Sequence, residues 1–167
     1  MGDMVKKYHF GLFLDKTPGE ETPTWFRIKK SVSLDLTMNP ELKDYDYIAD
    51  ESPTKELDKY SPAISQDLTM YKGEEDYDFI FERFFNQSVG EDAHTNVCIV
   101  FYKEPEEEGA APTHFKAWMS DCIISINDMN GVDSVINFDV NFGGTTQKGY
   151  VTVSGKTISF TEGPYSA

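Results

Sequence analysis

Histidine and cysteine are the side chains of this sequence that could build a metal site. His9, His94 and His114 show no pairing of the kind that zinc sites use, and neither Cys98 nor Cys122 lies at metal-binding spacing from the other. We therefore expect no metal and no other cofactor, and histidines that are exposed or hydrogen-bonded internally. Both cysteines lie within apolar strand patterns, which predicts two reduced core thiols, with one bridge between neighbouring strands as the alternative.

Carboxylates make the acidic segment that starts at Asp44 a candidate calcium loop. The calcium-loop template matches at Asp46 but puts Ile48 where an oxygen ligand is needed. It also puts Ala49 at the glycine position and Lys55 at the closing glutamate. The template fails, so we interpret the acidic residues as a solvated surface or as a source of electrostatic field.

Catalytic motifs are also missing from the sequence. Gly155-Lys156-Thr157 is similar to the end of a phosphate-binding loop, but the earlier glycine of that motif is replaced by Tyr150. The sequence has no G-x-S-x-G elbow, and with 29 acidic residues any pairing of carboxylates is uninformative. We expect no enzyme activity.

The composition predicts one globular domain, residues 1–167, with a formal net charge of −14. Such a chain lacks the basic residues that neutralise phosphates, which excludes a conventional nucleic-acid binder. No run of eighteen apolar residues occurs, and the N-terminus has no signal-peptide cleavage pattern. We expect no membrane insertion and a protein made and kept in a cytoplasm.

Apolar periodicity predicts a mainly β fold, an antiparallel β-sandwich or barrel with one flanking α-helix. Residues 26–38 alternate as a half-buried strand, and 95–102 are apolar on both faces, which indicates a central strand. Further strands are expected at 115–126 and 132–142, followed by a hairpin of 150–153 with 157–160. The helix is expected over about 74–87, and its predicted core face consists of Tyr77, Ile80, Phe81, Phe84 and Phe85.

A long, polar and acidic stretch, about 41–71, separates the first long strand from the helix. Strand character at 44–49 and at 63–71 around a turn-rich centre predicts a β-hairpin arm that projects from the body. A two-stranded hairpin without hydrophobic support is marginally stable, so such an arm needs a partner chain.

The order of several short patterns resembles that of a known family, the major tail (tail tube) proteins of long non-contractile-tailed bacteriophages. The resemblance runs from about residue 7 to 160 and is an ordered set of patterns, not a single signature. These are Trp25-Phe26-Arg27-Ile28, Ser33-Leu34-Asp35-Leu36, Asn39-Pro40-Glu41, Asp46-Tyr47-Ile48-Ala49-Asp50-Glu51, Pro53-Thr54, Leu57, Tyr60-Ser61-Pro62, Ile64, Tyr71-Lys72-Gly73 and Phe138-Asp139-Val140-Asn141-Phe142-Gly143-Gly144.

The resemblance implies a β-sandwich whose copies form six-membered rings that stack into a tube, with an arm that lines the lumen or reaches neighbouring subunits. It implies a virion tail protein, assembled in the host bacterial cytoplasm, whose partners are other copies of itself, a tape-measure protein and tail tip or terminator proteins. DNA would pass through the lumen without specific binding. Because the chain ends at Ala167, we expect no C-terminal immunoglobulin-like domain. The arm residues expected at the lumen or between subunits are Asp44, Asp46, Asp50, Glu51, Glu56, Asp58, Tyr45, Tyr47, Tyr60 and Ile64.

Several alternatives stay open at this point. The acidic side chains of the arm could be a merely solvated face, and Tyr45, Tyr47 and Tyr60 could pack under their own hairpin. A soluble β-sandwich binding module of the carbohydrate or adhesion type would use Trp25 and Trp118 as a surface platform. A related tube protein of type VI secretion is a further alternative.

Overall fold

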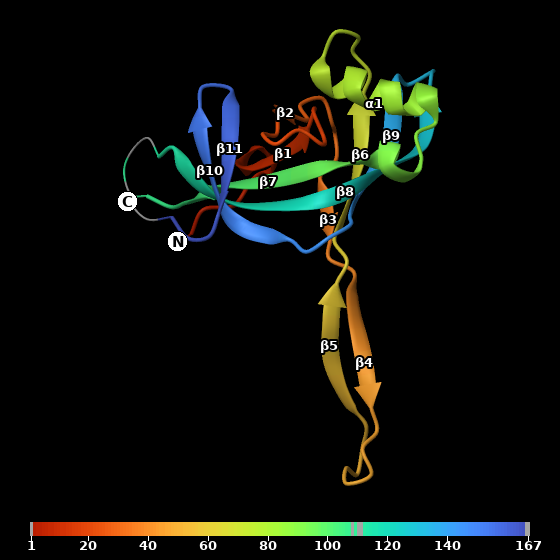
Figure 1. Cartoon of the computed structure of the whole chain (residues 1–167), viewed down its shortest axis with the longest axis vertical. Coiled ribbons are helices and arrows are strands. Elements are labelled where there is room, and N and C mark those ends of the chain that lie inside the picture. Colours follow the sequence, from red (N-terminus) through yellow and green to blue (C-terminus); the bar gives the residue numbers. More distant parts are fainter. Residues whose placement is uncertain (1, 108, 110–111, 166–167) are drawn as a thin grey trace.

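The computed structural model describes residues 2–107, 109 and 112–165. It shows a β-rich body from which a two-stranded arm projects (Figure 1). The elements of the described residues, in chain order, are η1 (Lys7–His9), β1 (Phe10–Asp15), β2 (Trp25–Arg27), β3 (Asp35–Thr37), β4 (Pro40–Tyr45), β5 (Thr54–Tyr60), β6 (Ala63–Thr69), α1 (Glu75–Asn86), η2 (Gly90–Ala93), β7 (His94–Pro105), β8 (His114–Asn130), β9 (Val135–Phe142), β10 (Gln147–Ser154) and β11 (Thr157–Glu162).

All strand pairs in the described part of the chain are antiparallel, as the sequence predicts. Nine strands form one sheet, in which the order β2-β1-β7-β8-β9-β6-β3 is extended by β10 and β11. The long strand β8 pairs with β10 through residues 114–119 and with β9 through residues 122–130. The sheet therefore divides along β8, and the mainly β, antiparallel fold with one packed helix is confirmed.

Strand β7 is central, and both its faces are buried. Val97 and Ile99 pack into the larger core cluster, under helix α1, whereas Cys98 and Val100 pack into a second cluster with β10 and β11. Cys122 belongs to the larger cluster, so the two cysteines lie on opposite sides of the sheet. Both are free thiols, as predicted, and burial raises the pKa of the Cys122 thiol to about 12.

The predicted single strand over 26–38 is wrong. Strands β2 and β3 are separated by an irregular segment, because the backbone N–H groups of Lys29 and Lys30 donate to the Asp76 carboxylate of α1, at 3.0 and 3.2 Å. Within that segment Val32, assigned to the apolar face, is 77% exposed. A buried carboxylate on a distant helix thus overrides the local alternation.

Helix α1 begins and ends within one residue of the predicted limits, but its predicted core face is partly wrong. Ile80 is fully buried, and Tyr77 and Phe84 pack partly against the core. Phe79 is buried instead of Phe81 and Phe85, which are 37% and 73% exposed. The helix is rotated because Asp76 must reach the N–H groups of the β2–β3 connection, which directs Phe79 onto Phe26, with ring centroids 4.9 Å apart.

The later strands lie close to their predicted positions. Strand β8 is longer than predicted because it continues past a bulge between Ile126 and Asp128. The predicted hairpin of β10 and β11 turns through Gly155, at φ 62°. The acidic loop after β7 is described at Glu107 but not at residues 108, 110 and 111, which lie outside the described residues.

Candidate assembly surface

The arm consists of β4 and β5, which lie almost entirely within the predicted range of about 41–71 but not at the two predicted strand positions. The predicted strands were 44–49 and 63–71, whereas residues 46–53 form the tip of the arm and β6 (Ala63–Thr69) belongs to the body sheet. The alternating pattern of β6 led us to predict it as a strand of the arm. Its buried face, which includes Ile64 and Leu68, packs in the body core instead.

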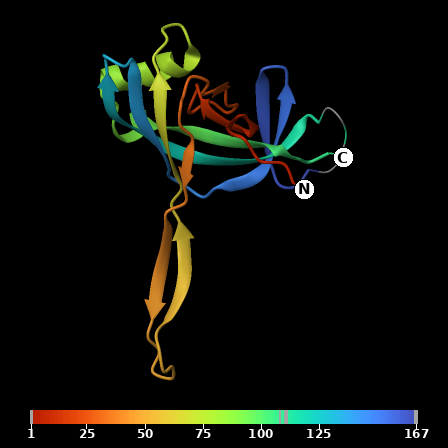
Figure 2. The ribbon, with the colours of Figure 1, turned by 180° about the vertical axis from the view of Figure 1, so that it is seen from behind.

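The arm continues the β3–β6 ladder of the body. Met38 accepts a hydrogen bond at 3.0 Å from the backbone N–H of Ser61, and the Asn39 side chain donates to the Ser61 carbonyl at 3.0 Å. Asn39 has a left-handed backbone, φ 47°, followed by Pro40. This junction directs the arm away from the body, as both views of the ribbon show (Figures 1 and 2).

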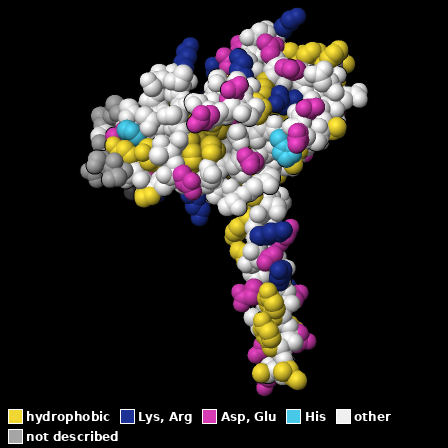
Figure 3. Space-filling view, viewed as in Figure 1, with side chains coloured by type: hydrophobic (Ala, Val, Ile, Leu, Met, Phe, Trp, Pro, Cys, Tyr) yellow, Lys and Arg dark blue, Asp and Glu magenta, His cyan; other side chains and the backbone are white. Residues whose placement is uncertain are grey.

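Three apolar side chains and a proline lie on one face of the arm near the body, and the pair of Asp44 and Lys55 follows them on the same face. Leu42 is directly opposite Leu57 and shares its face with Pro40 and Tyr60. Leu42, Leu57 and Tyr60 are 59%, 48% and 51% exposed, so this apolar stripe is open to solvent. Figure 3 shows apolar side chains along the arm and at its tip.

The other face carries cross-strand ion pairs. Lys43 lies 3.2 Å from Asp58, and Lys59 lies 3.4 Å from Glu41, in both cases between the side-chain nitrogen and a carboxylate oxygen. Exposed pairs of this kind contribute only about 0–1 kcal/mol each. They keep the register of the hairpin but cannot replace a hydrophobic face.

The tip of the arm is both acidic and apolar. Ile48 is 105% exposed and Tyr47 is 56% exposed, and the rings of Tyr45 and Tyr47 stack with centroids 5.5 Å apart. The rings of Tyr45 and Tyr47 thus contact each other within one monomer, but Tyr47 is still more than half exposed. Fully burying an isoleucine such as Ile48 would stabilise a contact by about 1.5–3 kcal/mol.

The predicted arm residues divide into three groups. Most lie in the strands or the tip of the arm and are exposed, with Tyr45 half-buried. Ile64, in contrast, is 1% exposed in the body core and is not part of any arm surface. The exposed acidic members are Asp44, Asp46, Asp50, Glu51, Glu56 and Asp58.

The tryptophans do not form the surface platform that a binding module would need. Trp25 packs against the core cluster of β10 and β11, and Trp118 packs against Phe101, with ring centroids 5.4 Å apart. Both side chains are half-buried. The buried part of each ring packs against one of the two cores, and Trp25 also borders a cleft.

Two buried carboxylates hold connections of the body. Asp15, fully buried, accepts hydrogen bonds from the backbone N–H groups of Thr17 and Thr24 and from the side chain of Asn96. Asp76, 2% exposed, binds the β2–β3 connection. These hydrogen bonds hold the two connections in place.

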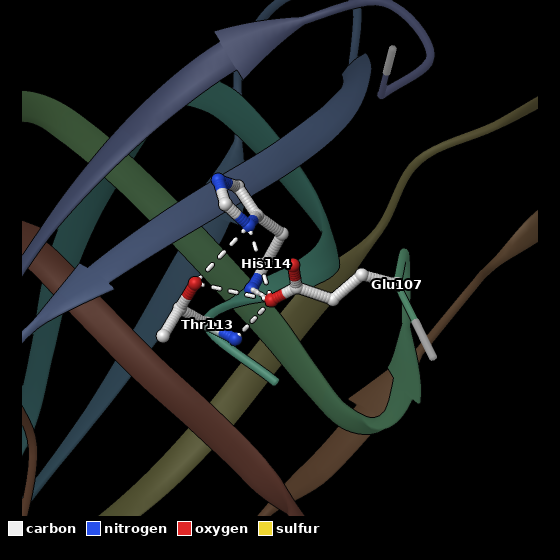
Figure 4. A network of polar contacts seen from close by, with 3 residues as sticks. All are labelled: Glu107, Thr113 and His114. Carbon is white, nitrogen blue, oxygen red and sulfur yellow. Dashed lines mark hydrogen bonds and ion pairs between the residues drawn. The ribbon is translucent and has the colours of Figure 1, made fainter. Parts of the chain in front are cut away.

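A polar network joins the end of β7 to the start of β8 (Figure 4). One oxygen of Glu107 accepts hydrogen bonds from the backbone N–H and hydroxyl of Thr113 and from the backbone N–H of His114, and lies 3.2 Å from His114 Nδ1. These donors lower the pKa of Glu107 to about 2. The Nδ1 atom of His114 thus has polar partners within the protein, which agrees with the expected internally hydrogen-bonded histidine.

Among the residues that the structure describes, no group of three or more metal-ligating side chains is found. In the same residues, no helix has the length and apolarity needed to cross a membrane.

Comparisons with known proteins find matches among solved structures. No family model and no curated protein matches the sequence. Among solved structures, a chain of the cryo-EM structure of the anti-feeding prophage baseplate, 6-fold symmetrised, matches at 12% identity with a TM-score of 0.46. The match covers 89% of this chain and 97% of that chain. This similarity is too low to assign a function.

Proposed function

We propose that this chain is a structural, non-enzymatic subunit of a phage tail tube, in which six copies form a ring and the rings stack. The observation that carries the proposal is the arm, a hairpin with an exposed apolar stripe and an exposed apolar tip. Every residue of β5 is exposed, and β4 has only Tyr45 half-buried.

An arm of this kind gains order when a neighbouring copy covers it. An isolated two-stranded hairpin is marginally stable in water, and exposed strand edges pair readily with another chain. Docking between copies would bury Leu42, Leu57 and Tyr60 and add main-chain hydrogen bonds at the edges of β4 and β5. Assembly therefore supplies the hydrophobic contacts that the monomer lacks.

The charge of the chain suits a conduit for DNA. The arm carries seven acidic and three basic side chains, and the whole chain has a net charge of −14. An acidic wall repels a polyanion over a Debye length of about 8 Å at physiological salt, which keeps DNA mobile in a lumen. In this proposal some arm acids face the lumen, and a tape-measure protein and tail tip or terminator proteins are further partners in the virion tail.

The test is a variant without an arm. Because Met38 and Ser61 are hydrogen-bonded across the junction and Asn39 already has a left-handed backbone, residues 40–60 can be replaced by one glycine. The resulting Asn-Gly turn matches the preferred two-residue hairpin connection. We expect the variant to keep the thermal unfolding temperature of the parent and to lose ring and tube formation.

Assembly is measured by electron microscopy and sedimentation of concentrated protein. The matched control is the double substitution Val132→Ser with Val89→Ser, which removes exposed apolar side chains outside the arm and should leave assembly intact. Rings formed equally well by the armless variant would refute the proposal. Parent protein that stays monomeric at all concentrations, and also when added to growing tails in an infected cell extract, would refute it as well.

A further inference from the structure

A cleft of about 700 Å³ opens between strand β2, the turn that joins β10 and β11, and the start of α1. Aromatic and apolar side chains form part of its wall, among them Trp25, Tyr102 and Ile158. In Figure 1 these elements lie at the end of the body that is remote from the arm. The cleft and the arm tip are therefore at opposite ends of the long axis of the molecule.

The cleft brings four cationic side chains together on an acidic protein. Lys16, Arg27, Lys29 and Lys156 line it, and the three lysines are exposed. Figure 3 shows Lys and Arg side chains interspersed with Asp and Glu side chains at this end of the body. Three carboxylates, those of Glu74, Glu75 and Asp76, also line it, so the four cations leave the lining with one net positive charge. Asp76 is 2% exposed and accepts the N–H groups of Lys29 and Lys30, so the carboxylates open to an incoming segment are those of Glu74 and Glu75.

The arm tip offers the complementary charge and complementary apolar groups. Asp46, Asp50 and Glu51 lie at the tip beside Tyr47 and Ile48, and all five are exposed. Opposite charges across an interface guide the encounter and set its register, while buried aromatic side chains supply affinity. The cleft provides both kinds of partner group, cations and aromatic rings.

Strand β2 also presents a backbone edge to the cleft. The carbonyl of Thr24 accepts a hydrogen bond from the N–H of Lys16, and the N–H of Ile28 donates to the carbonyl of Leu12. Backbone groups that bond to β1 therefore occur at every second residue, 24, 26 and 28. The backbone groups of Trp25 and Arg27 then face away from β1, and β2 has no second strand partner in the described part of the chain. An extended segment entering the cleft can form main-chain hydrogen bonds there.

We propose that this cleft receives the arm tip of a second copy of the chain, stacked along the long axis. The inference rests on the proposed tube function and specifies the acceptor site for the arm. Because donor and acceptor are different surfaces at opposite ends of one molecule, the contact is heterologous and repeats without closing, as required for axial growth.

Cysteine cross-linking tests the contact directly. The full chain with Ser52→Cys in the arm tip and Thr24→Cys in the cleft is compared with the pair Ser52→Cys and Val132→Cys, whose second site is 94% exposed and outside the cleft. The native cysteines are buried and do not compete. We expect a ladder of oxidised multimers several-fold stronger for the Thr24 pair. An equal ladder in both, or no Ser52–Thr24 product at the highest soluble concentration, overturns the acceptor assignment.

Charge reversal provides a second test. Lys29→Glu with Lys156→Glu should weaken association about tenfold, while Lys116→Glu with Lys148→Glu, the same change in net charge outside the cleft, should have little effect. Adding Asp46→Lys with Glu51→Lys to the cleft variant should restore association. Equal loss in both lysine pairs, or no rescue, contradicts the assignment.

The two proposals fail in different ways. If the armless variant associates like the parent, the proposed function fails. If the armless variant fails to associate, but the cleft substitutions leave association unchanged and no cross-link forms at Thr24→Cys, only the acceptor site is wrong.

Discussion

Gly149 in strand β10 is a position where one methyl group should cost much of the stability of the body. A Cβ at Gly149 would lie 2.0 Å from the carbonyl oxygen of Thr161 and 2.9 Å from the Cα of Glu162, both backbone atoms of β11. An ordinary contact needs about 3.5 Å, so β11 would have to move by about 1.5 Å. Glu162 is the ladder partner of Gly149, so such a shift breaks the pairing at the end of the hairpin.

The expected cost of Gly149→Ala follows from that displacement. Overpacking in a tight site costs about 1–3 kcal/mol, and each lost backbone hydrogen bond adds about 0.5–1.5 kcal/mol. We expect a loss of about 3 kcal/mol in the free energy of unfolding, which for a domain of this size lowers the melting temperature by about 6–12 °C.

The matched control is Gly131→Ala, because a Cβ there meets no atom within 4 Å and its backbone is not left-handed. That variant should be equal to the parent or more stable by about 0.4–1 kcal/mol. The assay is urea unfolding followed by circular dichroism. If the two alanine variants differ by less than about 1 kcal/mol, the close approach of β10 and β11 is not as the structure describes it.

Three further predictions concern the helix and the β7–β8 loop. Asp76→Ala leaves the N–H groups of the β2–β3 connection without their acceptor and should cost about 1–3 kcal/mol in chemical unfolding, whereas Glu75→Ala on the exposed side should be nearly neutral; similar values would contradict the anchoring role. Phe79→Ala should cost about 3–5 kcal/mol and Phe85→Ala less than about 1 kcal/mol, and a reversed order would restore the predicted core face. The pKa of Glu107, lowered to about 2, makes its carboxylate stabilise the loop above the ordinary carboxyl pKa and release it as the pH falls toward 2; carboxyl NMR titration with a midpoint near 4 would refute the network.

Much of the body could be predicted because each of its strands and its helix carries apolar residues at the spacing typical of that element. Strand β7 is apolar at consecutive positions from Val97 to Val100, and such a run indicates a strand buried on both faces. The β10–β11 hairpin has its turn glycine at Gly155, and α1 has acidic residues at its start. These signals are local, so no distant contact is needed to recognise them.

The candidate assembly surface was predictable in kind but not in its limits. The acidic composition between strand and helix indicates an arm, yet β6 also alternates, and its membership of the body sheet depends on pairing with β9. Sequence spacing likewise could not show that Ile64 faces the core. The cleft beside β2 was not predicted, because Lys16, Lys29 and Lys156 come together only through the sheet topology.

The sequence by itself determined the mainly β fold class, the position of the helix and the presence of a long acidic projection, because hydrophobic periodicity and turn residues act over a few positions. Tertiary structure alone decided which strands pair, how α1 is rotated and where the arm leaves the body. Those outcomes depend on contacts between residues far apart in the chain, such as Asp76 with Lys29 and β6 with β9. Each of these long-range contacts selects one strand pairing or helix orientation among several that the local sequence preferences allow.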